Sequence, residues 1–588
     1  MLKLLKYLRK RDCFFALGCV AFMVGNVYLE LKIPDYMQNI LQLLGTNQIE
    51  IKDILTNGGF MVLFAIGSAL CAIVGNFFSS IIASSLGRNV RGAIYGKVID
   101  FSDAEIKEFS TPSLITRSTN DVTQVQNIIA MGLSIMVKAP VMAVMALCKI
   151  VASHFEWTLA TILAVVFVFI TILIMIIVAL PKFRIIQTLT DNLNRVTREE
   201  LTGTRVVRAF NAEKYQEKKF EKVNTDITNN SLFISKFMSL LDPTMTIVMS
   251  GLPLAIYAIG AMLNNQINFV DFQARSLVIS QMMTFSTYAI QVVMSFVMLI
   301  MIFIMLPRAQ VAANRINEVL NKKSSIIDGD GTNEPIKTGE VQFVNVGFKY
   351  PDAEEYVLHD ISFKAERGQT IAFIGSTGSG KSTLINLVPR IYDATEGQVI
   401  VDGVNVKDYT HEQLADKIGY IAQKANLFSG TVRSNIAIGE KNGLKPSEDE
   451  IKNAIDIAQA NFVYDLDGGL DAKIDQGGKN VSGGQKQRIS IARAIARNPE
   501  ILIFDDSFSA LDYKTDKNLR AAIKEKLSDV TCLIVAQRIG TIKNADKIIV
   551  LDNGRVVGEG THVELMKSCS VYKEIALSQL SKEELKNA

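Results

Sequence analysis

The sequence has few cysteines, only four histidines and almost no net charge. Its six cysteines form no CxxC pair and four of them lie in apolar segments, which argues against a disulfide framework and a thiolate zinc site. The 62 basic and 59 acidic residues nearly cancel, so bulk charge gives no support for nucleic-acid binding. Low-complexity tracts and short repeats are also absent from it. A small secreted, fibrous or disordered protein is therefore excluded, and 588 residues indicate more than one folding unit.

In place of these features the chain has long stretches without a charged residue. The clearest are residues 54–87, 157–181, 243–270 and 276–307. Each exceeds the ~20 residues that a helix needs to cross a bilayer. Two weaker stretches, before and after the first of these, are apolar apart from a few charges. We predict six membrane-spanning helices, at about 13–33, 58–86, 127–150, 157–180, 243–264 and 276–306.

Basic residues are concentrated on alternate connections between these spans. They are frequent at the N-terminus and after the second and fourth spans, whereas the other side has little beyond Lys52 and Arg275. Basic loops stay in the cytoplasm, so both chain ends are predicted to be cytoplasmic. Residues 1–11 space leucines among basic residues, which is typical of a helix lying at the membrane interface. They run into the first span without a small-residue cleavage site, so we expect no cleavable signal peptide.

The character of the sequence changes at about Lys322. A polar linker is predicted over 322–338, between a transmembrane domain at 1–321 and a nucleotide-binding domain at 339–588. In the second domain short apolar runs alternate with amphipathic helical stretches. That alternation predicts an α/β fold around a mostly parallel sheet.

A phosphate-binding loop follows the first strongly apolar strand of this second domain. It fits GxxxxGK[ST] between a predicted strand and a predicted helix. Its residues are Gly375, Ser376, Thr377, Gly378, Ser379, Gly380, Lys381 and Ser382, and Thr383 follows them. Its glycines let backbone N–H groups face the phosphates, Lys381 would neutralise phosphate oxygens and Ser382 would ligate Mg²⁺. Asp505 ends a later apolar strand and is the expected carboxylate on the Mg²⁺ side, so ATP and Mg²⁺ are the predicted ligands.

The run 480–488, NVSGGQKQR, closely resembles the LSGGQ motif of ABC transporter ATPases, with Val481 in place of leucine. Together with six N-terminal spans, this resemblance is to ABC exporter half-transporters and covers essentially the whole chain. It implies a polytopic α-helical membrane domain, with long cytoplasmic helical extensions, followed by an α/β P-loop ABC ATPase domain. It also implies that two chains pair in the plasma membrane, with each ATP between one P-loop and the other chain's Ser482, Gly483, Gly484 and Gln485.

The same resemblance implies roles for further residues. Tyr350 resembles the aromatic residue that stacks on adenine, and Gln423 resembles the glutamine that senses Mg²⁺ and the γ-phosphate. Residues 509–512, SALD, resemble the D-loop that ends at Asp512 and helps to complete the partner's site. Residues 101–117 and 208–222 resemble the regions that hold the two coupling helices, although ordinary solvated loops remain an alternative.

Two positions depart from the family pattern. Asp506 stands where a glutamate usually orients or deprotonates the attacking water, and a carboxylate misplaced by roughly 1 Å can cost ~10²-fold in rate. Gln537 stands where a switch histidine is usual, and glutamine donates hydrogen bonds but cannot become cationic. Either change alone is compatible with drift. Together they resemble the degenerate subunit of a heterodimeric ABC exporter, which binds ATP but hydrolyses it slowly.

The transported molecule is less clearly indicated. The resemblance implies ATP-driven export of amphipathic small molecules, drugs or lipids. Two alternatives stay open: a regulatory ATP-binding subunit or ATP-gated channel that does not pump, and an exporter of unprocessed peptides. Lys138, in the third predicted span, is either part of a transport site or a structural cation paired with a neighbouring helix, for example through Glu30. Methionines in the sixth span suit apolar ligands but equally suit packing.

Overall fold

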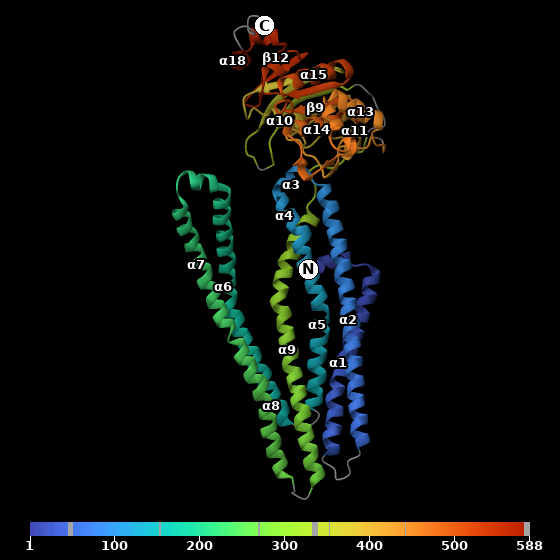
Figure 1. Ribbon diagram of the computed structural model, residues 1–588, viewed down its shortest axis with the longest axis vertical. Coiled ribbons are helices and arrows are strands. Elements are labelled where there is room, and N and C mark those ends of the chain that lie inside the picture. The colour runs from blue at the N-terminus through green and yellow to red at the C-terminus, as the bar shows by residue number, and fades with distance from the viewer. Residues whose placement is uncertain are drawn as a thin grey trace. The chain divides into compact units, whose positions relative to one another are not determined.

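The computed structural model describes residues 1–44, 51–151, 155–267, 271–331, 339–351, 353–441 and 443–580. Residues 332–338 of the predicted linker lie outside this part. The chain divides into two compact units, described separately below (Figure 1). The helical unit comprises Met1–Ile99 and Pro112–Lys322, and the ATPase unit comprises Asp100–Thr111 and Lys323–Ala588. The segment Asp100–Thr111, which the sequence assigns to the membrane domain, therefore packs with the ATPase unit.

The helical unit contains six helices that are long and apolar enough to cross a membrane, which confirms the prediction of six spans. Its elements are η1 (Leu2–Tyr7), α1 (Lys10–Leu44), α2 (Ile51–Ile99), α4 (Thr111–Thr116), the π-helix η2 (Arg117–Asp121), α5 (Val122–Val151), α6 (Phe155–Ala209), α7 (Glu213–Met238), α8 (Leu241–Gln266) and α9 (Phe272–Asn321). Several of these helices are much longer than the charge-free stretches that predicted the membrane spans. The 55 residues of α6 correspond to about 80 Å at 1.5 Å per residue, and α6 and α7 form a long hairpin (Figure 1).

The core of this unit joins α1, α5, α6, α8 and α9 around large aromatic side chains. Trp157 is fully buried, and its indole N–H donates to the carbonyl of Ile256 at 3.2 Å. Charges within the helices are paired: Lys138 on α5 lies 2.9 Å from Glu30 on α1. Of the two alternatives for Lys138, the contact is the one expected of a structural cation. Asp35 likewise binds Lys149 and accepts a hydrogen bond from Tyr288.

The ATPase unit is built on three sheets, of which the six-stranded one has the order β12-β11-β3-β10-β9-β6. Five of its strands are parallel and only β12 is antiparallel, as the alternating pattern of the sequence predicts. An antiparallel sheet of order β2-β1-β4-β5, which the sequence did not reveal, packs beside it, and β7 pairs with β8. The strands are β1 (Val341–Phe348), β2 (Leu358–Ala365), β3 (Thr370–Gly375), β4 (Glu396–Val401), β5 (Val404–Asn405), β6 (Ile418–Ile421), β7 (Gly430–Thr431), β8 (Lys473–Ile474), β9 (Ile501–Asp505), β10 (Thr531–Val535), β11 (Lys547–Asp552) and β12 (Arg555–Gly560).

Helices cover the sheets of this unit, and most begin at a side-chain cap. They are α3 (Asp103–Phe109), α10 (Lys381–Asn386), α11 (His411–Lys417), α12 (Val432–Ile436), α13 (Glu448–Ile457), α14 (Gly483–Ile495), α15 (Tyr513–Lys526), α16 (Ile539–Ile542), α17 (His562–Ser568) and α18 (Ser570–Gln579), with short 3₁₀ turns η3 (Asn461–Asp465), η4 (Gly469–Asp471) and η5 (Gln476–Gly478). Capping boxes begin α3, α11, α12, α13, α14 and α17. Such caps satisfy backbone N–H groups at a helix start and fix where each helix begins.

Candidate functional site

The predicted phosphate loop and its partners lie at one edge of the six-stranded sheet. The register pairs Val535 of β10 with both Asp505 of β9 and Phe373 of β3, so these parallel strands end side by side. The loop after β3, the carboxylates at the end of β9 and the residues after β10 are therefore neighbours. This is the edge at which open α/β sheets bind ligands.

Backbone geometry explains the glycines of the loop. Gly378 and Gly380 have φ angles of +88° and +91°, a region that side chains disfavour. A Cβ on Gly380 would also lie 2.7 Å from the side chain of Leu358. The Lys381 ammonium turns back over the loop and donates to the carbonyls of Gly375 at 3.0 Å and Ser376 at 2.6 Å. Burial lowers the pKa of Lys381, and the nearby carboxylates oppose that shift.

Ser382, at the start of α10, and Asp505 form an oxygen-rich pair. The Ser382 hydroxyl donates to the Asp505 carboxylate at 2.6 Å. Burial raises the pKa of Asp505, the Ser382 hydrogen bond lowers it, and the neighbouring Asp506 raises it further. A bound divalent cation would offset the cost of this buried charge, and hydroxyl and carboxylate oxygens are ligands that Mg²⁺ prefers. The donor set therefore fits Mg²⁺, which would neutralise charge on the phosphates of a nucleotide held by the loop.

Asp506 is 6% exposed and its carboxylate is held by two amides. One of its oxygens accepts from Gln537 Nε2 at 2.7 Å and from Gln423 Nε2 at 3.3 Å. The backbone carbonyl of Gln537 accepts a hydrogen bond from the side-chain amide of Gln579 at 2.8 Å. The structure thus brings together Gln423, Asp506 and Gln537 from three separate parts of the sequence, beside the Ser382–Asp505 pair.

Tyr350, which follows β1, packs beside the start of α10. Its hydroxyl lies 3.0 Å from that of Thr383, and its ring meets Tyr392 edge-on with centroids 5.3 Å apart. Lys107 of α3 lies over the Tyr350 ring, 5.6 Å from its centroid, and donates to the Tyr392 hydroxyl at 2.7 Å. Asp103 binds Lys107 at 2.7 Å and accepts from Tyr392. Burial and the hydrogen bond to Asp103 raise the pKa of Tyr392 to about 12, with Lys107 opposing the shift.

Sequence reasoning missed this cluster of Lys107, Asp103 and Tyr392. The only local signal was the opposite-charge pair at i,i+4 in the segment 101–117. Tyr392 carries no motif, and it lies 285 residues from Lys107 in the sequence. The cluster connects the predicted adenine-stacking residue to α3.

The SGGQ motif forms the exposed start of α14. The Ser482 hydroxyl accepts from the Gln485 backbone N–H at 3.3 Å, and the Gln485 side chain accepts from the Ser482 N–H at 2.8 Å. A Cβ on Gly484 would lie 3.3 Å from the carbonyl of Ala510, so the motif is next to the predicted D-loop. Ser482 and Gly483 remain exposed. Asp512 caps α15 by accepting from Thr515, and these hydrogen bonds lower its pKa.

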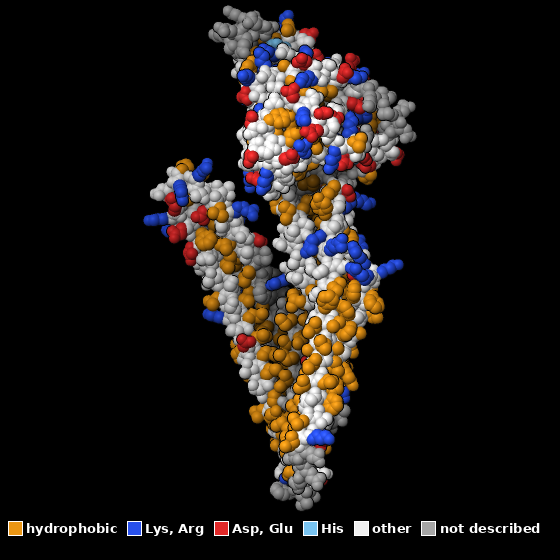
Figure 2. Space-filling model, turned by 45° about the vertical axis from the view of Figure 1, so that its right-hand side comes forward, with side chains coloured by type: hydrophobic (Ala, Val, Ile, Leu, Met, Phe, Trp, Pro, Cys, Tyr) orange, Lys and Arg blue, Asp and Glu red, His pale blue; other side chains and the backbone are white. Residues whose placement is uncertain are grey.

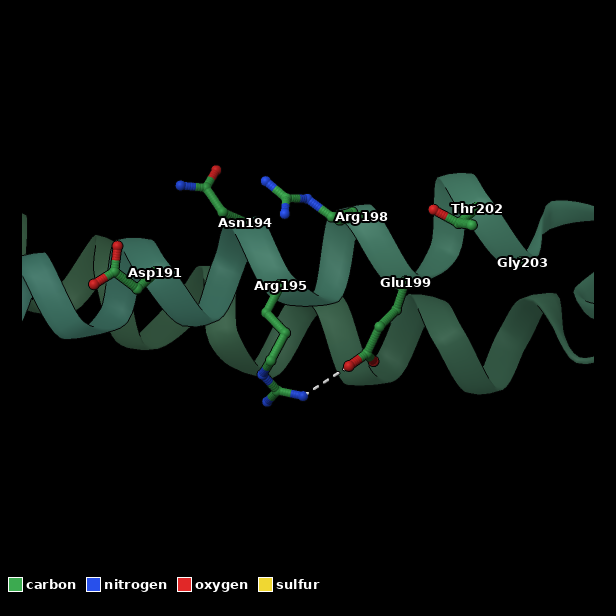
Figure 3. A pocket seen from close by; sticks show the side chains of 7 residues that line it. All are labelled: Asp191, Asn194, Arg195, Arg198, Glu199, Thr202 and Gly203. Carbon is green, nitrogen blue, oxygen red and sulfur yellow. Dashed lines mark hydrogen bonds and ion pairs between the residues drawn. The ribbon is translucent and has the colours of Figure 1, made fainter. Parts of the chain in front are cut away.

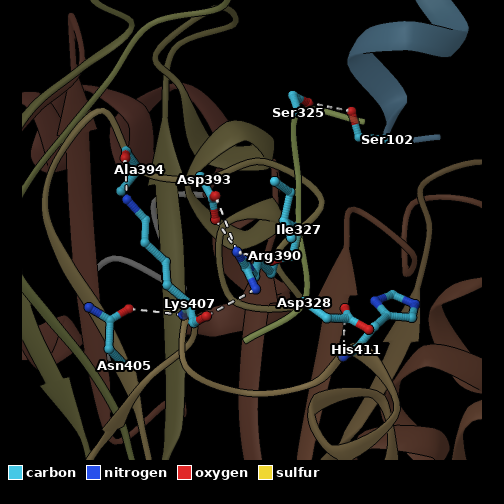
Figure 4. A network of polar contacts seen from close by, with 10 residues as sticks. All are labelled: Ser102, Ser325, Ile327, Asp328, Arg390, Asp393, Ala394, Asn405, Lys407 and His411. Carbon is cyan, nitrogen blue, oxygen red and sulfur yellow. Dashed lines mark hydrogen bonds and ion pairs between the residues drawn. The ribbon is translucent and has the colours of Figure 1, made fainter. Parts of the chain in front are cut away.

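A polar network binds the residues that follow α9 to the ATPase unit (Figure 4). The hydroxyls of Ser325 and Ser102 lie 2.9 Å apart, and the carbonyl of Ile327 accepts from Arg390 at 2.9 Å. Asp328 accepts from the backbone N–H of His411 at 3.2 Å. Arg390 precedes Tyr392 by two residues, so one short segment after α10 binds both the chain leaving α9 and α3.

A groove of about 710 Å³ in the helical unit lies along α6 and contains none of these motifs. Figure 3 shows Arg195 and Glu199 joined by an ion pair of 2.9 Å, with Asn194 and Arg198 pointing away from that pair. Lys219 on α7 binds the same Glu199 at 2.8 Å. These contacts join the two helices of the hairpin, and we assign the groove no chemistry.

Comparison with known proteins gives consistent matches for both units. A family model described as the ABC transporter transmembrane region matches residues 13–287, and one described as ABC transporter matches residues 358–509. An uncharacterized ABC transporter ATP-binding protein of Mycobacterium tuberculosis is 40% identical over 87% of this chain and 86% of its own length. An ATP-dependent lipid A-core flippase of Pseudomonas aeruginosa is 32% identical over 88% of this chain and 83% of its own. The structure of a bacterial Atm1-family ABC exporter with ATP bound superimposes with a TM-score of 0.78 at 22% identity, covering 97% of this chain and 99% of that one.

Proposed function

Because the chain belongs to the ABC transporter family, as an exporter half-transporter that couples ATP hydrolysis to transport, we propose that it works as the degenerate subunit of a heterodimer. In this proposal its own P-loop binds ATP at a site that hydrolyses slowly. Its SGGQ motif completes the partner's site, where most turnover occurs.

The observation that carries this proposal is that the Asp506 side chain is short and is already hydrogen-bonded by two side-chain amides. Aspartate is one methylene shorter than the glutamate usual in the family, and its Oδ2 is already bound by the amides of Gln537 and Gln423. The two amide hydrogen bonds fix the orientation of this shorter carboxylate, whereas a group that orients or deprotonates water has to lie at hydrogen-bond distance from that water. Gln537 stays neutral, so it stabilises developing negative charge on phosphate less than a cationic imidazolium would.

The other residues of the site support retention of ATP. Tyr350 would stack on adenine, the N–H groups of Gly375–Thr383 would surround the phosphates, and Lys381 would neutralise their charge. Ser382 and Asp505 would hold Mg²⁺, with Gln423 beside them. The intact and exposed Ser482–Gln485 motif, next to Asp512, supports the division of labour, since a subunit that only bound ATP would not need it.

We propose that the exported molecules are amphipathic, drugs or lipids, and that the chain works in the plasma membrane with both ends in the cytoplasm. The similarity to a protein named as a lipid A-core flippase supports a lipid-like cargo. Basic residues gather at the ends of the helices that lead into the ATPase unit, which supports the orientation. Paired charges inside the helical unit leave its membrane surface largely apolar.

The test measures ATPase activity and dye transport in proteoliposomes. This chain alone is compared with the same chain co-expressed with the half-transporter encoded next to it. We expect activity only in the pair. Full activity of this chain alone would show that Asp506 and Gln537 suffice for catalysis, and the proposal of a degenerate site would be wrong.

A further inference from the structure

A second groove of the helical unit has the chemistry of a binding site but contains no residue of the nucleotide site. It has a volume of about 370 Å³ and lies between the start of α1 and the second half of α2. Arg9 and Arg11 from the start of α1 and Arg88 from α2 line one part of it. The rest is lined by other residues of α2, among them Phe77, Ile81 and Ser84.

The groove changes from apolar to cationic along α2. Phe77, Ile81, Ser84 and Arg88 recur every three or four residues and so share one helix face. The eleven helical steps from Phe77 to Arg88 span about 16 Å. Along this distance the lining passes from an aromatic and an aliphatic side chain, through an exposed serine hydroxyl, to guanidinium groups.

Contacts around the groove hold its two sides together. The Arg9 guanidinium donates to the Asn89 side chain at 3.3 Å, and the Asn89 amide donates to the Tyr7 carbonyl at 2.8 Å. Asp12 is the nearby acidic residue, and it is 1% exposed. Its carboxylate accepts from the Arg9 backbone N–H at 2.9 Å and from Ser85 at 2.8 Å, and so caps α1.

The positive charge of the groove is not neutralised by any ion pair among the described residues. Across the part of the chain that the structure describes, no carboxylate forms an ion pair with Arg9, Arg11 or Arg88. The nearby Asp12 carboxylate already accepts hydrogen bonds from the Arg9 backbone N–H and from Ser85. Arginine binds phosphate oxygens through paired N–H donors, so a phosphate group complements this arrangement.

The surface beside the groove is apolar enough to lie in a membrane. Phe14 and Leu17 on α1 and Phe77 on α2 are 75%, 71% and 61% exposed. Figure 2 shows Lys and Arg side chains gathered on this unit where a continuous hydrophobic surface ends. A change from apolar to basic marks the headgroup layer of a bilayer. Arg88 belongs to the basic segment after the second predicted span, and basic segments stay in the cytoplasm, so this layer is expected on the cytoplasmic side.

We propose that this groove binds an anionic phospholipid of the cytoplasmic leaflet. Arg9, Arg11 and Arg88 contact its phosphate, Ser84 contacts the headgroup region, and the acyl chains lie along Phe77 and the neighbouring apolar side chains. A free phosphate would use only the cationic end, whereas a phospholipid fits both ends, and basic sites between helices at this level suit anionic headgroups. The bound lipid would join the start of α1 to α2 as a structural ligand. This proposal depends on neither the partner subunit nor the cargo.

The test is native mass spectrometry of the full-length chain in detergent, titrated with phosphatidylglycerol, phosphatidylcholine or inorganic phosphate. The variant is Arg9→Gln/Arg11→Gln/Arg88→Gln. The matched control is Lys3→Gln/Lys6→Gln/Lys10→Gln, which removes the same number of positive charges from the N-terminal segment but from outside the groove. We expect phosphatidylglycerol to bind the wild-type chain in preference to phosphatidylcholine. Its affinity should fall about 10²-fold in the arginine variant and only a few-fold in the control.

Three results would overturn the proposal. Equal losses in the two triple variants would mean that the lipid responds to general surface charge. Equal retention of phosphatidylcholine would remove the selectivity for an anionic headgroup, and displacement of the lipid by inorganic phosphate would make this a phosphate site. If the triple variant does not fold, Arg11→Gln alone is the substitute, because Arg11 is exposed, and we expect about a fivefold loss.

Discussion

At the scale of single residues, the site departs from the family pattern at two side chains that touch each other. Asp506 and Gln537 are joined by a hydrogen bond of 2.7 Å, so a substitution at either position also changes the surroundings of the other. The two substitutions are therefore one feature of the site, and their consequences for catalysis should be measured together.

The first prediction distinguishes the ATP site on this chain's P-loop from the partner's ATP site, which this chain's SGGQ motif is proposed to complete. In the two-chain complex, Asp506→Ala should leave most of the ATPase activity, because that carboxylate contributes little to turnover. Ser482→Ala should lower the activity at least ~10²-fold, since it removes a contact to the ATP held by the partner. The measurement is the steady-state ATPase rate of the purified complexes.

Ser482 also caps α14, and loss of a cap costs about 1 kcal/mol of stability. Thr561→Ala is the matched control, because Thr561 caps α17 with the same capping box but belongs to no ATP motif. It should have the same small effect on thermal unfolding and leave the activity unchanged. Equal losses of activity from Asp506→Ala and Ser482→Ala would contradict the assignment.

Residues of contiguous motifs were predictable from the sequence, and residues that meet only through folding were not. The loop 375–383 is recognisable because phosphate wrapping requires glycines at fixed spacing. Asp505 is recognisable because it ends an apolar strand. By contrast, nothing near Gln579 indicates that its amide donates to the Gln537 carbonyl, since that contact depends on how α18 packs.

At the scale of elements, the short helix α3 carries Lys107, which contacts two aromatic rings of the ATPase unit. It connects α2 to α4 in sequence, yet it packs within the ATPase unit. Lys107 contacts the rings of Tyr350 and Tyr392 at once. Binding of adenine at Tyr350 would therefore change the surroundings of a charge carried by α3.

The second prediction concerns this contact. Lys107→Met removes a charge-assisted hydrogen bond and the cation over both rings, so α3 should respond less to bound ATP. Transport by the two-chain complex should fall about tenfold more than its ATPase activity. Dye transport and ATPase rate are measured in the same proteoliposomes. Lys107→Arg keeps the charge and should retain most of the coupling, and parallel losses of both activities in Lys107→Met would disprove the role of this contact.

The third prediction concerns the ion pair between α1 and α5. Lys138→Met leaves Glu30 without its partner inside the helical unit, which is costly in an apolar environment. The thermal midpoint in detergent should fall by a few degrees, and adding Glu30→Gln should restore it. Transport should return with stability. A stable double variant that does not transport would show instead that Lys138 acts on the cargo.

At the scale of the whole molecule, the proposed function has the chain contribute residues to two ATP sites. Its P-loop edge lies at the carboxyl ends of β3, β9 and β10, whereas its SGGQ motif is the exposed start of α14. The order of domains and the six spans were predictable from charge-free windows and motifs. The antiparallel sheet β2-β1-β4-β5 was not, because β1 pairs with β4 across a segment that includes β2, β3 and α10.

The fourth prediction follows from the proposed difference in hydrolysis rate between the two ATP sites. In the two-chain complex both sites should bind ATP, but a single turnover should convert only the nucleotide held by the partner's P-loop and this chain's SGGQ motif. After one turnover with radiolabelled ATP, the bound nucleotide should therefore be about half ATP and half ADP. Lys381→Ala in this chain should remove the retained ATP, because it weakens phosphate binding at the slow site only. Complete conversion to ADP in the unmutated complex would mean that both sites turn over, and Asp506 would then have to be counted as a working catalytic carboxylate.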